Sequence, residues 1–348
     1  MINDALKYHK KHKGKIGTLV ISPVKNRADL SLAYTPGVAE ASKEIAKNKK
    51  KVFDYTIKGH TVGIVTDGSA VLGLGNIGPE AALPVMEGKA ALFKTFANLD
   101  AFPVCLTTQN VDEIVATVKN ISPVFGAINL EDIAAPRCFE VEEKLQSLGI
   151  PVMHDDQHGT AVVVLAGLIN AAIVTGKKLK NLKVVILGSG AAGSGIVYLI
   201  KDEVSNIICV DSKGIISKSR KGLEAYKQKL AKVTNKQNLS GSLQDALMGA
   251  DALIGVSTAN IVKENDIKLM GNKPVIFAMA NPNPEIMPDR AKKAGAYVVA
   301  TGRSDFANQI NNSLAFPGIF KGALSVGANT ISQDMKKAAA TEANRKAP

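Results

Sequence analysis

Short apolar segments alternate with longer amphipathic segments along almost the whole of this 348-residue chain. Segments of four to six mainly apolar residues are typical of strands that are buried on both faces, and the segments between them have helical spacing. Strands are expected at residues 61–66, 102–106, 127–130, 150–153, 183–187, 206–210, 252–256, 274–279 and 296–300. Helices are expected at residues 4–12, 39–47, 80–97, 111–121, 140–148 and 159–175. This alternation predicts an α/β protein with mostly parallel sheets.

The length of the chain predicts two domains of roughly 150 to 190 residues each. We place the first at residues 1–158 and the second at residues 159–348, because a polar stretch ends there and a long apolar helix begins. The first is expected to be an α/β domain, and the second a doubly wound domain. No internal repeat is present, and residues after Met335 form a Lys- and Ala-rich tail of low complexity.

The formal net charge of +12 raises the question of nucleic acid binding. Against it, only 5% of residues are aromatic, tryptophan is absent, and the basic segments 7–15, 47–51 and 336–346 lie apart, as solvated helix faces do. The charge would equally attract anionic small molecules, so we expect no nucleic acid partner.

Three separated cysteines predict neither disulfides nor a thiolate zinc site, and no membrane-spanning segment or signal peptide is evident. A cytoplasmic protein is expected.

The motif G-x-G-x-x-G occurs twice, at residues 73–78 and 188–193. Only the second follows a strand without a gap and opens a helix, with Asp211 ending the next strand, as in dinucleotide-binding domains. Its pyrophosphate-binding residues would be Gly188, Ser189, Gly190, Ala191, Ala192 and Gly193. The first motif is better interpreted as a loop that covers a substrate. Asp211 favours NAD by accepting from ribose hydroxyls, although the adjacent Lys213 could hold the 2′-phosphate of NADP.

Acidic residues follow three strands of the first domain: Asp67, the pair Glu131 and Asp132, and the pair Asp155 and Asp156. Parallel strands bring their carboxyl ends to one edge, so these groups should converge there. Carboxylates suit Mg²⁺ or Mn²⁺.

The histidines of the same stretch, His154 and His158, have the spacing of zinc ligands. His154, however, should end a strand and the two acids should occupy the following turn, so the rings need not share a face. The alternative to a metal site is a pair of helix-capping acids with solvated histidines.

Lys89 lies within an apolar helix, where partial burial would lower its pKa and suit a general base. Taken alone, an ordinary solvated lysine remains the alternative.

Several stretches together resemble the malic enzymes, in their short bacterial form. They are residues 31–39, 65–78, 129–133, 154–161, 280–282 and 311–312. The resemblance implies a substrate and metal domain followed by a Rossmann-type NAD(P)-binding domain. It also implies oxidative decarboxylation of (S)-malate to pyruvate and CO₂ with reduction of NAD(P), decarboxylation of oxaloacetate, and a homodimer.

The resemblance further implies roles for individual residues. Tyr34 matches the family's general acid and Lys89 its general base, with Asp155 a further acid of the catalytic set. Glu131, Asp132 and Asp156 match the metal ligands, and Lys89, Asn281 and Asn312 contact the substrate. Two alternatives stay open: a malolactic enzyme, which makes lactate and retains NAD, and a non-catalytic dinucleotide-binding regulator.

Overall fold

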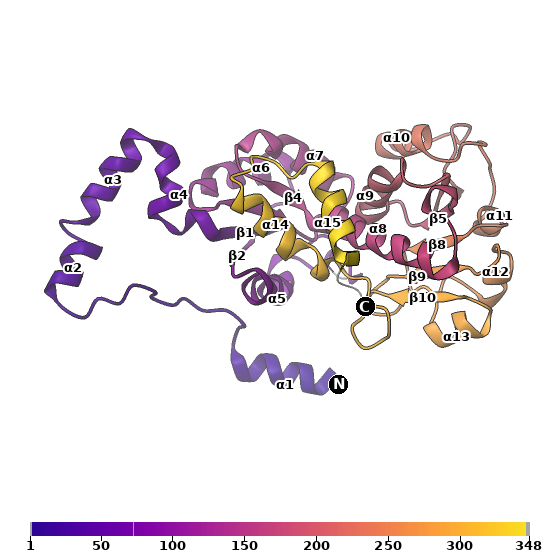
Figure 1. The fold of residues 1–348 in the computed structure, drawn as a ribbon, viewed down its shortest axis with the longest axis horizontal. Coiled ribbons are helices and arrows are strands. Elements are labelled where there is room, and N and C mark those ends of the chain that lie inside the picture. The colour runs from indigo at the N-terminus through magenta and orange to yellow at the C-terminus, as the bar shows by residue number, and fades with distance from the viewer. Residues whose placement is uncertain (1, 72, 346–348) are drawn as a thin grey trace.

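The first sheet of the computed structural model, which describes residues 2–71 and 73–345, has four parallel strands in the order β2-β1-β3-β4 (Figure 1). The strands are β1 (Thr61–Thr66), β2 (Asp100–Cys105), β3 (Ala127–Leu130) and β4 (Val152–His154). They are accompanied by the helices α5 (Pro79–Ala97), α6 (Val111–Ile121) and α7 (Arg137–Leu145). Val65 lies opposite Leu130, and Leu130 lies opposite His154, so the ends of β1, β3 and β4 are level. The expected strands are confirmed to within two residues.

The second sheet has the order β10-β9-β8-β5-β6-β7 and is parallel except for the short β7. Its strands are β5 (Lys183–Leu187), β6 (Asn206–Asp211), β7 (Gly214–Ile215), β8 (Ala252–Gly255), β9 (Val275–Ala278) and β10 (Val298–Thr301). Its helices are α9 (Ala191–Ile200), α10 (Ala225–Val233), α11 (Leu243–Leu247), α12 (Glu264–Lys268) and α13 (Pro288–Lys293). The chain runs outward from β5 in both directions, which confirms the doubly wound arrangement and puts a switch point between β5 and β8.

Helix α8 (Asp155–Thr175) joins the two sheets. It begins four residues before the expected start at Gly159, so the prediction that Asp155 and Asp156 occupy a turn was wrong; they form the first turn of the helix. Its length and composition would allow it to cross a membrane, but 67% of its most apolar window is buried inside the protein. Its side chains belong to one core with residues of both sheets, as in the core helix of a globular protein.

The C-terminal helices α14 (Phe316–Ser325) and α15 (Gln333–Arg345) return to the first part of the molecule. Phe316 and Phe320 of α14 stack edge-on against Phe93 of α5, with ring centroids 4.7 and 5.4 Å apart. The tail predicted to be of low complexity therefore forms a helix. The prediction of a solvated basic face also fails for Lys336, which is buried; Lys346 lies outside the described residues. The domain boundary after residue 158 stays a prediction.

Residues 16–57 form an arm that extends away from the rest of the protein, at the left of Figure 1. The arm carries the helices α2 (Arg27–Ala33), α3 (Val38–Lys47) and α4 (Val52–Tyr55) and follows helix α1 (Ile2–His12). The helix expected at residues 39–47 matches α3. None of the arm residues is buried.

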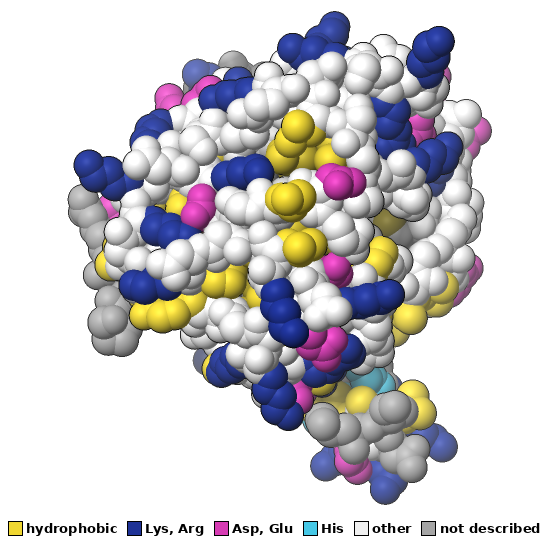
Figure 2. All heavy atoms as spheres, turned by 90° about the vertical axis from the view of Figure 1, so that its right-hand side faces the viewer, with side chains coloured by type: hydrophobic (Ala, Val, Ile, Leu, Met, Phe, Trp, Pro, Cys, Tyr) yellow, Lys and Arg dark blue, Asp and Glu magenta, His cyan; other side chains and the backbone are white. Residues whose placement is uncertain are grey.

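Basic side chains are dispersed over the face shown in Figure 2, on the side of the second sheet, with acidic and apolar side chains between them. On this face they form no continuous basic surface. The net charge is therefore spread out there, as expected for solvated helix faces and loops.

Candidate active site

A cavity of about 930 Å³ lies between the two halves of the protein. Its walls come from α5, from the loops after β1, β3, β5, β8 and β9, and from the segment before α14. The residues predicted from the sequence that line it are Lys89, Glu131, Asp132, Asp156, Gly190, Ala191, Ala192, Asn281 and Asn312. The structure thus brings the predicted metal, nucleotide and substrate groups to one space.

Three carboxylates meet at the first-sheet side of this cavity. Glu131, Asp132 and Asp156 each offer an oxygen, and these oxygens lie within 4.8 Å of one another. The first two follow β3 directly, where Asp132 has the left-handed φ of 53°, and its backbone N–H donates to Asp156 Oδ2 at 2.8 Å. The end of one strand and the first turn of α8 therefore hold the three groups together.

The electrostatics of the cluster fit a divalent cation. Burial raises the pKa of Glu131 well above its ordinary range, and the neighbouring Asp156, Asp155 and Asp132 add to the rise, while Lys89 opposes it. Asn129 Nδ2 donates to Glu131 Oε2 at 2.9 Å. Converging carboxylate oxygens repel one another in a buried site, and this oxygen set is one that Mg²⁺ or Mn²⁺ prefers.

Lys89 is buried beside this cluster. Its Nζ lies 3.0 Å from Glu131 Oε1, donates to Asp155 Oδ2, and lies 4.4 Å from the ring centroid of Phe316. Burial alone would lower its pKa, but the charges of Asp155, Glu131 and Asp156 outweigh burial and raise the pKa above its usual value. The lowered pKa expected from the sequence was therefore wrong, and the alternative of a solvated lysine was wrong as well.

Asp155 lies behind Lys89 and does not line the cavity. It is fully buried, and burial raises its pKa against the opposing charge of Lys89. Gly159, one helical turn later, makes room for this carboxylate, since a Cβ there would lie 1.8 Å from Asp155 Oδ1. The geometry therefore gives Asp155 contact with Lys89, and its predicted catalytic role remains a prediction.

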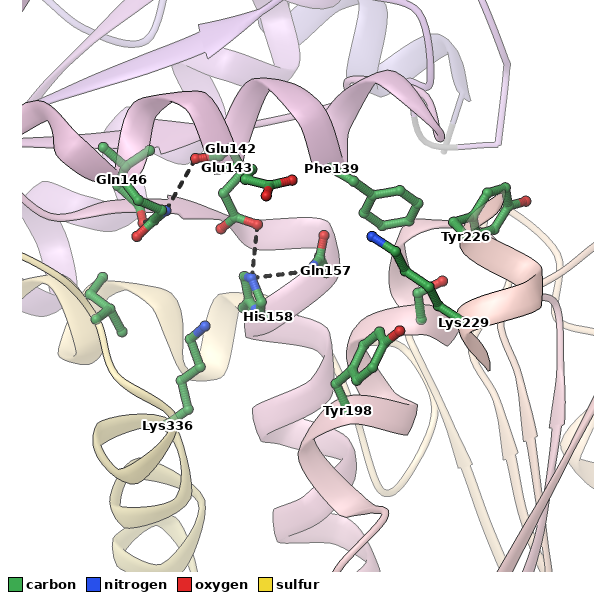
Figure 3. A pocket seen from close by; sticks show the side chains of 13 residues that line it. Phe139, Glu142, Glu143, Gln146, Gln157, His158, Tyr198, Tyr226, Lys229 and Lys336 are labelled. Carbon is green, nitrogen blue, oxygen red and sulfur yellow. Dashed lines mark hydrogen bonds and ion pairs between the residues drawn. The ribbon is translucent and has the colours of Figure 1, made fainter. Parts of the chain in front are cut away.

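The two histidines are both buried, so the interpretation of solvated histidines was wrong. His154 ends β4, with its Nε2 3.8 Å from Asp156 Oδ2. His158 turns away from the carboxylate cluster, and its Nε2 lies 3.0 Å from Glu142 Oε2 in a second cavity of about 390 Å³ (Figure 3). Glu142 also accepts from the His154 N–H at 3.0 Å. The rings thus contact different partners, which is unsuited to a shared zinc ion.

The loop after β1 lies against the loop after β9. Ala70 and Gly73 line the cavity, and a Cβ on Gly73 would lie 2.2 Å from the Asn281 carbonyl oxygen. Asp67, expected among the convergent acids, instead accepts from Arg137 Nη2 at 3.1 Å and from Ser69. It is therefore a structural group of this loop and no member of the carboxylate cluster. Leu72 of this loop lies outside the described residues.

The glycine motif forms the turn between β5 and α9. Gly188 has φ of 110°, and a Cβ on Gly193 would lie 1.9 Å from the Gly188 carbonyl oxygen. Gly190, with open space around its Cα hydrogens, lines the cavity. Close strand-to-helix packing and free backbone at the helix start are the features that let such a turn receive a pyrophosphate.

Asp211 ends β6 and is held by two cations that sequence reasoning missed. Arg220 Nη1 lies 2.8 Å and Lys227 Nζ 3.3 Å from its carboxylate, and the Lys213 N–H donates to it at 2.9 Å. Burial alone would raise the pKa of Asp211, but these donors lower it. Asp211 could therefore accept hydrogen bonds from a ribose, and Arg220 and Lys227 supply positive charge that could bind a phosphate.

Tyr34 is the one predicted catalytic residue that the structure leaves far from the others. It lies on the arm at the C-terminal end of α2, with 67% of its surface exposed, and it does not line the cavity. Asn281 and Asn312, by contrast, lie on the cavity wall in the loops after β9 and before α14. A single copy of the chain thus brings the predicted metal ligands, Lys89 and the two asparagines to one cavity, but not Tyr34.

Two family models match the chain. That of the malic enzyme N-terminal domain covers residues 13–146, and that of the malic enzyme NAD-binding domain covers residues 157–347. Together they span most of the sequence and both halves of the cavity.

Individual proteins give the same result. The chain is 56% identical over 339 residues to a bifunctional malic/malolactic enzyme of Bacillus subtilis, covering 97% of this chain and 83% of the relative. It is 46% identical to an NADP-dependent malic enzyme of Halomonas elongata, covering 96% and 80%. Among solved structures, an NAD-dependent malic enzyme of Thermotoga maritima is 51% identical with a TM-score of 0.95, covering 99% and 92%.

Proposed function

This chain belongs to the malic enzyme family, and from that premise we propose that it oxidises and decarboxylates (S)-malate to pyruvate and CO₂ with reduction of NAD or NADP. The observation that carries the proposal is the position of Lys89. Its ammonium lies against Glu131, and the cavity that both line extends to the glycine turn before α9. A base, a metal site and a dinucleotide site within one cavity are what this reaction requires.

The cation would be Mg²⁺ or Mn²⁺, held by Glu131, Asp132 and Asp156. When bound, it would draw electron density from the C2 oxygen of the substrate and so ease the loss of CO₂. Its positive charge would also oppose the carboxylates of Asp155, Glu131 and Asp156, which raise the pKa of Lys89. The metal would thereby favour the neutral lysine that a general base needs.

The protein's own groups then have the following roles. Lys89 takes the proton of the C2 hydroxyl as hydride leaves C2 for the nicotinamide, and Asp155 holds the lysine in position through its hydrogen bond. The side-chain amides of Asn281 and Asn312, which line the same cavity, donate to substrate oxygens. Tyr34 returns a proton to the enolate carbon after decarboxylation, which gives pyruvate. Oxaloacetate could enter the same sequence at the decarboxylation step.

Both nicotinamide cofactors have chemical support. Asp211 can accept from ribose hydroxyls, which favours NAD, whereas Arg220 and Lys227 beside it could bind a 2′-phosphate. The named relatives likewise include NAD- and NADP-dependent enzymes. We propose NAD as the better substrate, because an acid that ends the second strand of such a domain, as Asp211 does here, accepts hydrogen bonds from ribose hydroxyls.

A malolactic outcome is the second candidate, since the Bacillus subtilis relative is named a bifunctional malic/malolactic enzyme. The deciding assay incubates the protein with malate and Mn²⁺ and either NAD or NADP. Accumulation of reduced cofactor with pyruvate supports oxidative decarboxylation; lactate without net reduction supports the malolactic reaction. Cofactor binding with no turnover of malate would instead indicate a non-catalytic regulator.

We further propose that the protein is a cytoplasmic homodimer and that it binds neither nucleic acid nor membranes.

The base can be tested separately with Lys89→Ala. We expect at least a thousandfold loss of malate oxidation with NAD binding unchanged, because the variant removes the proton acceptor and leaves the distant nucleotide site intact. Lys94→Ala is the matched control, since Lys94 lies on the same helix but is exposed and pairs with Asp100 at 2.9 Å. Retained oxidation in Lys89→Ala would remove Lys89 from its role.

The metal site can be tested by calorimetry of Mn²⁺ binding to Asp156→Asn. Loss of one charged oxygen ligand should weaken binding by about tenfold or more, whereas the exposed Asp112→Asn should bind as the wild type does. Equal affinity in the two variants would rule out the proposed ligand set.

A further inference from the structure

The second cavity of about 390 Å³ has no part in the proposed reaction. Its lining residues come from α7, from the first turn of α8, from α9 and α10, and from α15 (Figure 3). The cavity therefore lies where helices of the first part of the chain meet helices of the second. Its volume is within the range of small-molecule sites, about 300 to 1,000 Å³. The chemistry of its walls indicates what kind of molecule it could bind.

The ammonium group of Lys336 is a buried charge that faces this cavity. Its side chain is 6% exposed, and among the described residues no hydrogen bond or ion pair joins its Nζ to another group. Glu142, which lies across from it, has other partners: its Oε1 accepts from the His154 N–H at 3.0 Å, and its Oε2 lies 3.0 Å from His158 Nε2. Burial lowers the pKa of Lys336 to about 8, so the amine is still mostly protonated at pH 7. Since an unpaired buried charge is costly, an anion in the cavity would be bound favourably.

A second buried polar group of the cavity also has no partner among the described residues. Gln157, in the first turn of α8, is 9% exposed, and its Oε1 accepts no hydrogen bond, whereas its Nε2 lies 3.1 Å from His158 Nε2. Close packing holds this wall in place, because a Cβ on Gly195 of α9 would lie 2.0 Å from the Gln157 carbonyl oxygen. The wall on α8 is therefore fixed, and it presents an acceptor that a hydroxyl or amino group of a ligand could meet.

Aromatic rings line the end of the cavity away from Lys336 (Figure 3). They belong to Phe139 of α7, Tyr198 of α9 and Tyr226 of α10, and the centroids of Phe139 and Tyr226 are 5.3 Å apart. The exposed side chains of Glu143 and Lys229 also line the cavity, but their charges are opposite in sign. The rings would favour a ligand with a flat, apolar body.

We propose that the second cavity is a binding site for a small organic acid, whose carboxylate accepts from Lys336 and whose flat, apolar body lies against the rings of Phe139, Tyr198 and Tyr226. The buried cation selects the charge of the ligand, and the aromatic walls select its body. The inference rests on this cavity alone and does not depend on the proposed reaction.

The site is linked to the active site by two features. Tyr226 lines both cavities. In the first turn of α8, Asp156 lines the active-site cavity, and the next residue, Gln157, lines the second cavity. A ligand that holds Tyr226 and this turn in one position changes the surroundings of the nucleotide and metal sites, so binding of the acid and binding of NAD are coupled.

Calorimetry with benzoate tests the site, since benzoate combines one carboxylate with a flat apolar ring. We expect benzoate to bind the wild type, and to bind Lys336→Met about tenfold more weakly or worse, because the variant lacks the charged donor. Lys337→Met is the matched control: Lys337 does not line the cavity and pairs with Glu203 at 2.7 Å, so this variant should bind benzoate as the wild type does. Circular dichroism and the melting temperature confirm that both variants are folded. No binding to the wild type, or equal binding to wild type and Lys336→Met, would overturn the proposal.

Two further probes separate the charge of the ligand from its body. Benzyl alcohol keeps the ring and lacks the charge, whereas acetate keeps the carboxylate and lacks the ring. Each should bind about tenfold more weakly than benzoate, or worse. Acetate that binds as tightly as benzoate would indicate a site for bare anions, and benzyl alcohol that does so would indicate an apolar pocket in which Lys336 has no role. Either result would refute the proposed class of ligand.

The coupling is tested by NAD binding with and without saturating benzoate. The dissociation constant of NAD should change about fivefold or more in the wild type and in Lys337→Met, and it should stay constant in Lys336→Met. An unchanged constant in the wild type would refute the coupling. Competition between benzoate and NAD that persists in Lys336→Met would place benzoate in the active-site cavity and overturn the site. None of these measurements requires turnover of malate, so failure of this inference is distinguishable from failure of the proposed function.

Discussion

The side chain of Lys336, on α15, is buried together with its ammonium group. We expect that replacing this lysine with an uncharged residue will stabilise the protein. It is 6% exposed and points into the second cavity beside His158 and across from Glu142 (Figure 3). Among the described residues its ammonium has no hydrogen bond or ion pair. Lys336→Met keeps the unbranched shape of the side chain and removes the charge.

The magnitude follows from the pKa. Burial lowers the pKa of Lys336 from 10.5 to about 8, although Glu142 opposes the change. At about 1.4 kcal/mol for each tenfold change in proton affinity, the protonated lysine costs the folded state about 3 kcal/mol at pH 7. Above pH 10.5 the amine is neutral in both states and the cost vanishes; below pH 8 it is charged in both and the full cost is present. Stability from this group therefore rises between pH 8 and pH 10.5.

The assay is urea denaturation of wild type and variant at several pH values. Lys336→Met should gain about 3 kcal/mol in the free energy of unfolding at pH 7, and the gain should fall to about 1 kcal/mol by pH 9.5. The control is Lys337→Met, since the neighbouring Lys337 is partly exposed and pairs with Glu203 at 2.7 Å; it should be neutral or slightly destabilising. A gain that does not change with pH, or a loss at pH 7, would refute the reasoning.

Two further predictions concern the nucleotide half. Gly193→Ala should lower the melting temperature and weaken NAD binding at least tenfold, measured by calorimetry, because its Cβ would lie 1.9 Å from the Gly188 carbonyl oxygen. Gly190→Ala, whose Cβ meets no protein atom within 4 Å, should weaken NAD binding with an unchanged melting temperature; a large drop would contradict the packing account. Asp211→Ala removes the carboxylate that pairs with Arg220 and Lys227, so both cations could then bind a 2′-phosphate. The kcat/KM for NADP divided by that for NAD should rise at least tenfold. An unchanged ratio would mean that this carboxylate does not contact the ribose.

Features that depend on residues close together in the sequence could be predicted well. The strand before Gly188, the glycine spacing and the acid after the next strand are all local, and the structure has the predicted strand, turn and helix in order. Glu131 and Asp156 could also be expected to meet, because the ends of neighbouring parallel strands are level and both residues follow such ends.

Features that depend on distant residues could not be predicted. Lys89 was expected to have a lowered pKa because the sequence shows its apolar helix but not Asp155, which lies 66 residues away and reverses the direction. In the same way, the sequence around Lys336 predicts a solvated basic tail, and only the packing of α15 buries that lysine.

The sequence by itself determined the order of strands and helices and the family, and it supplied the residues that we propose carry the chemistry, because these follow from periodicity and from motifs within short stretches. Tertiary structure alone decided the partner of each charged group: His158 faces Glu142 and not the carboxylate cluster, and Asp211 is held by Arg220. It also left Tyr34 on an exposed arm, away from Lys89. The physical reason is that burial and charge act through space over a few ångströms, and the sequence alone does not specify which distant residues come that close.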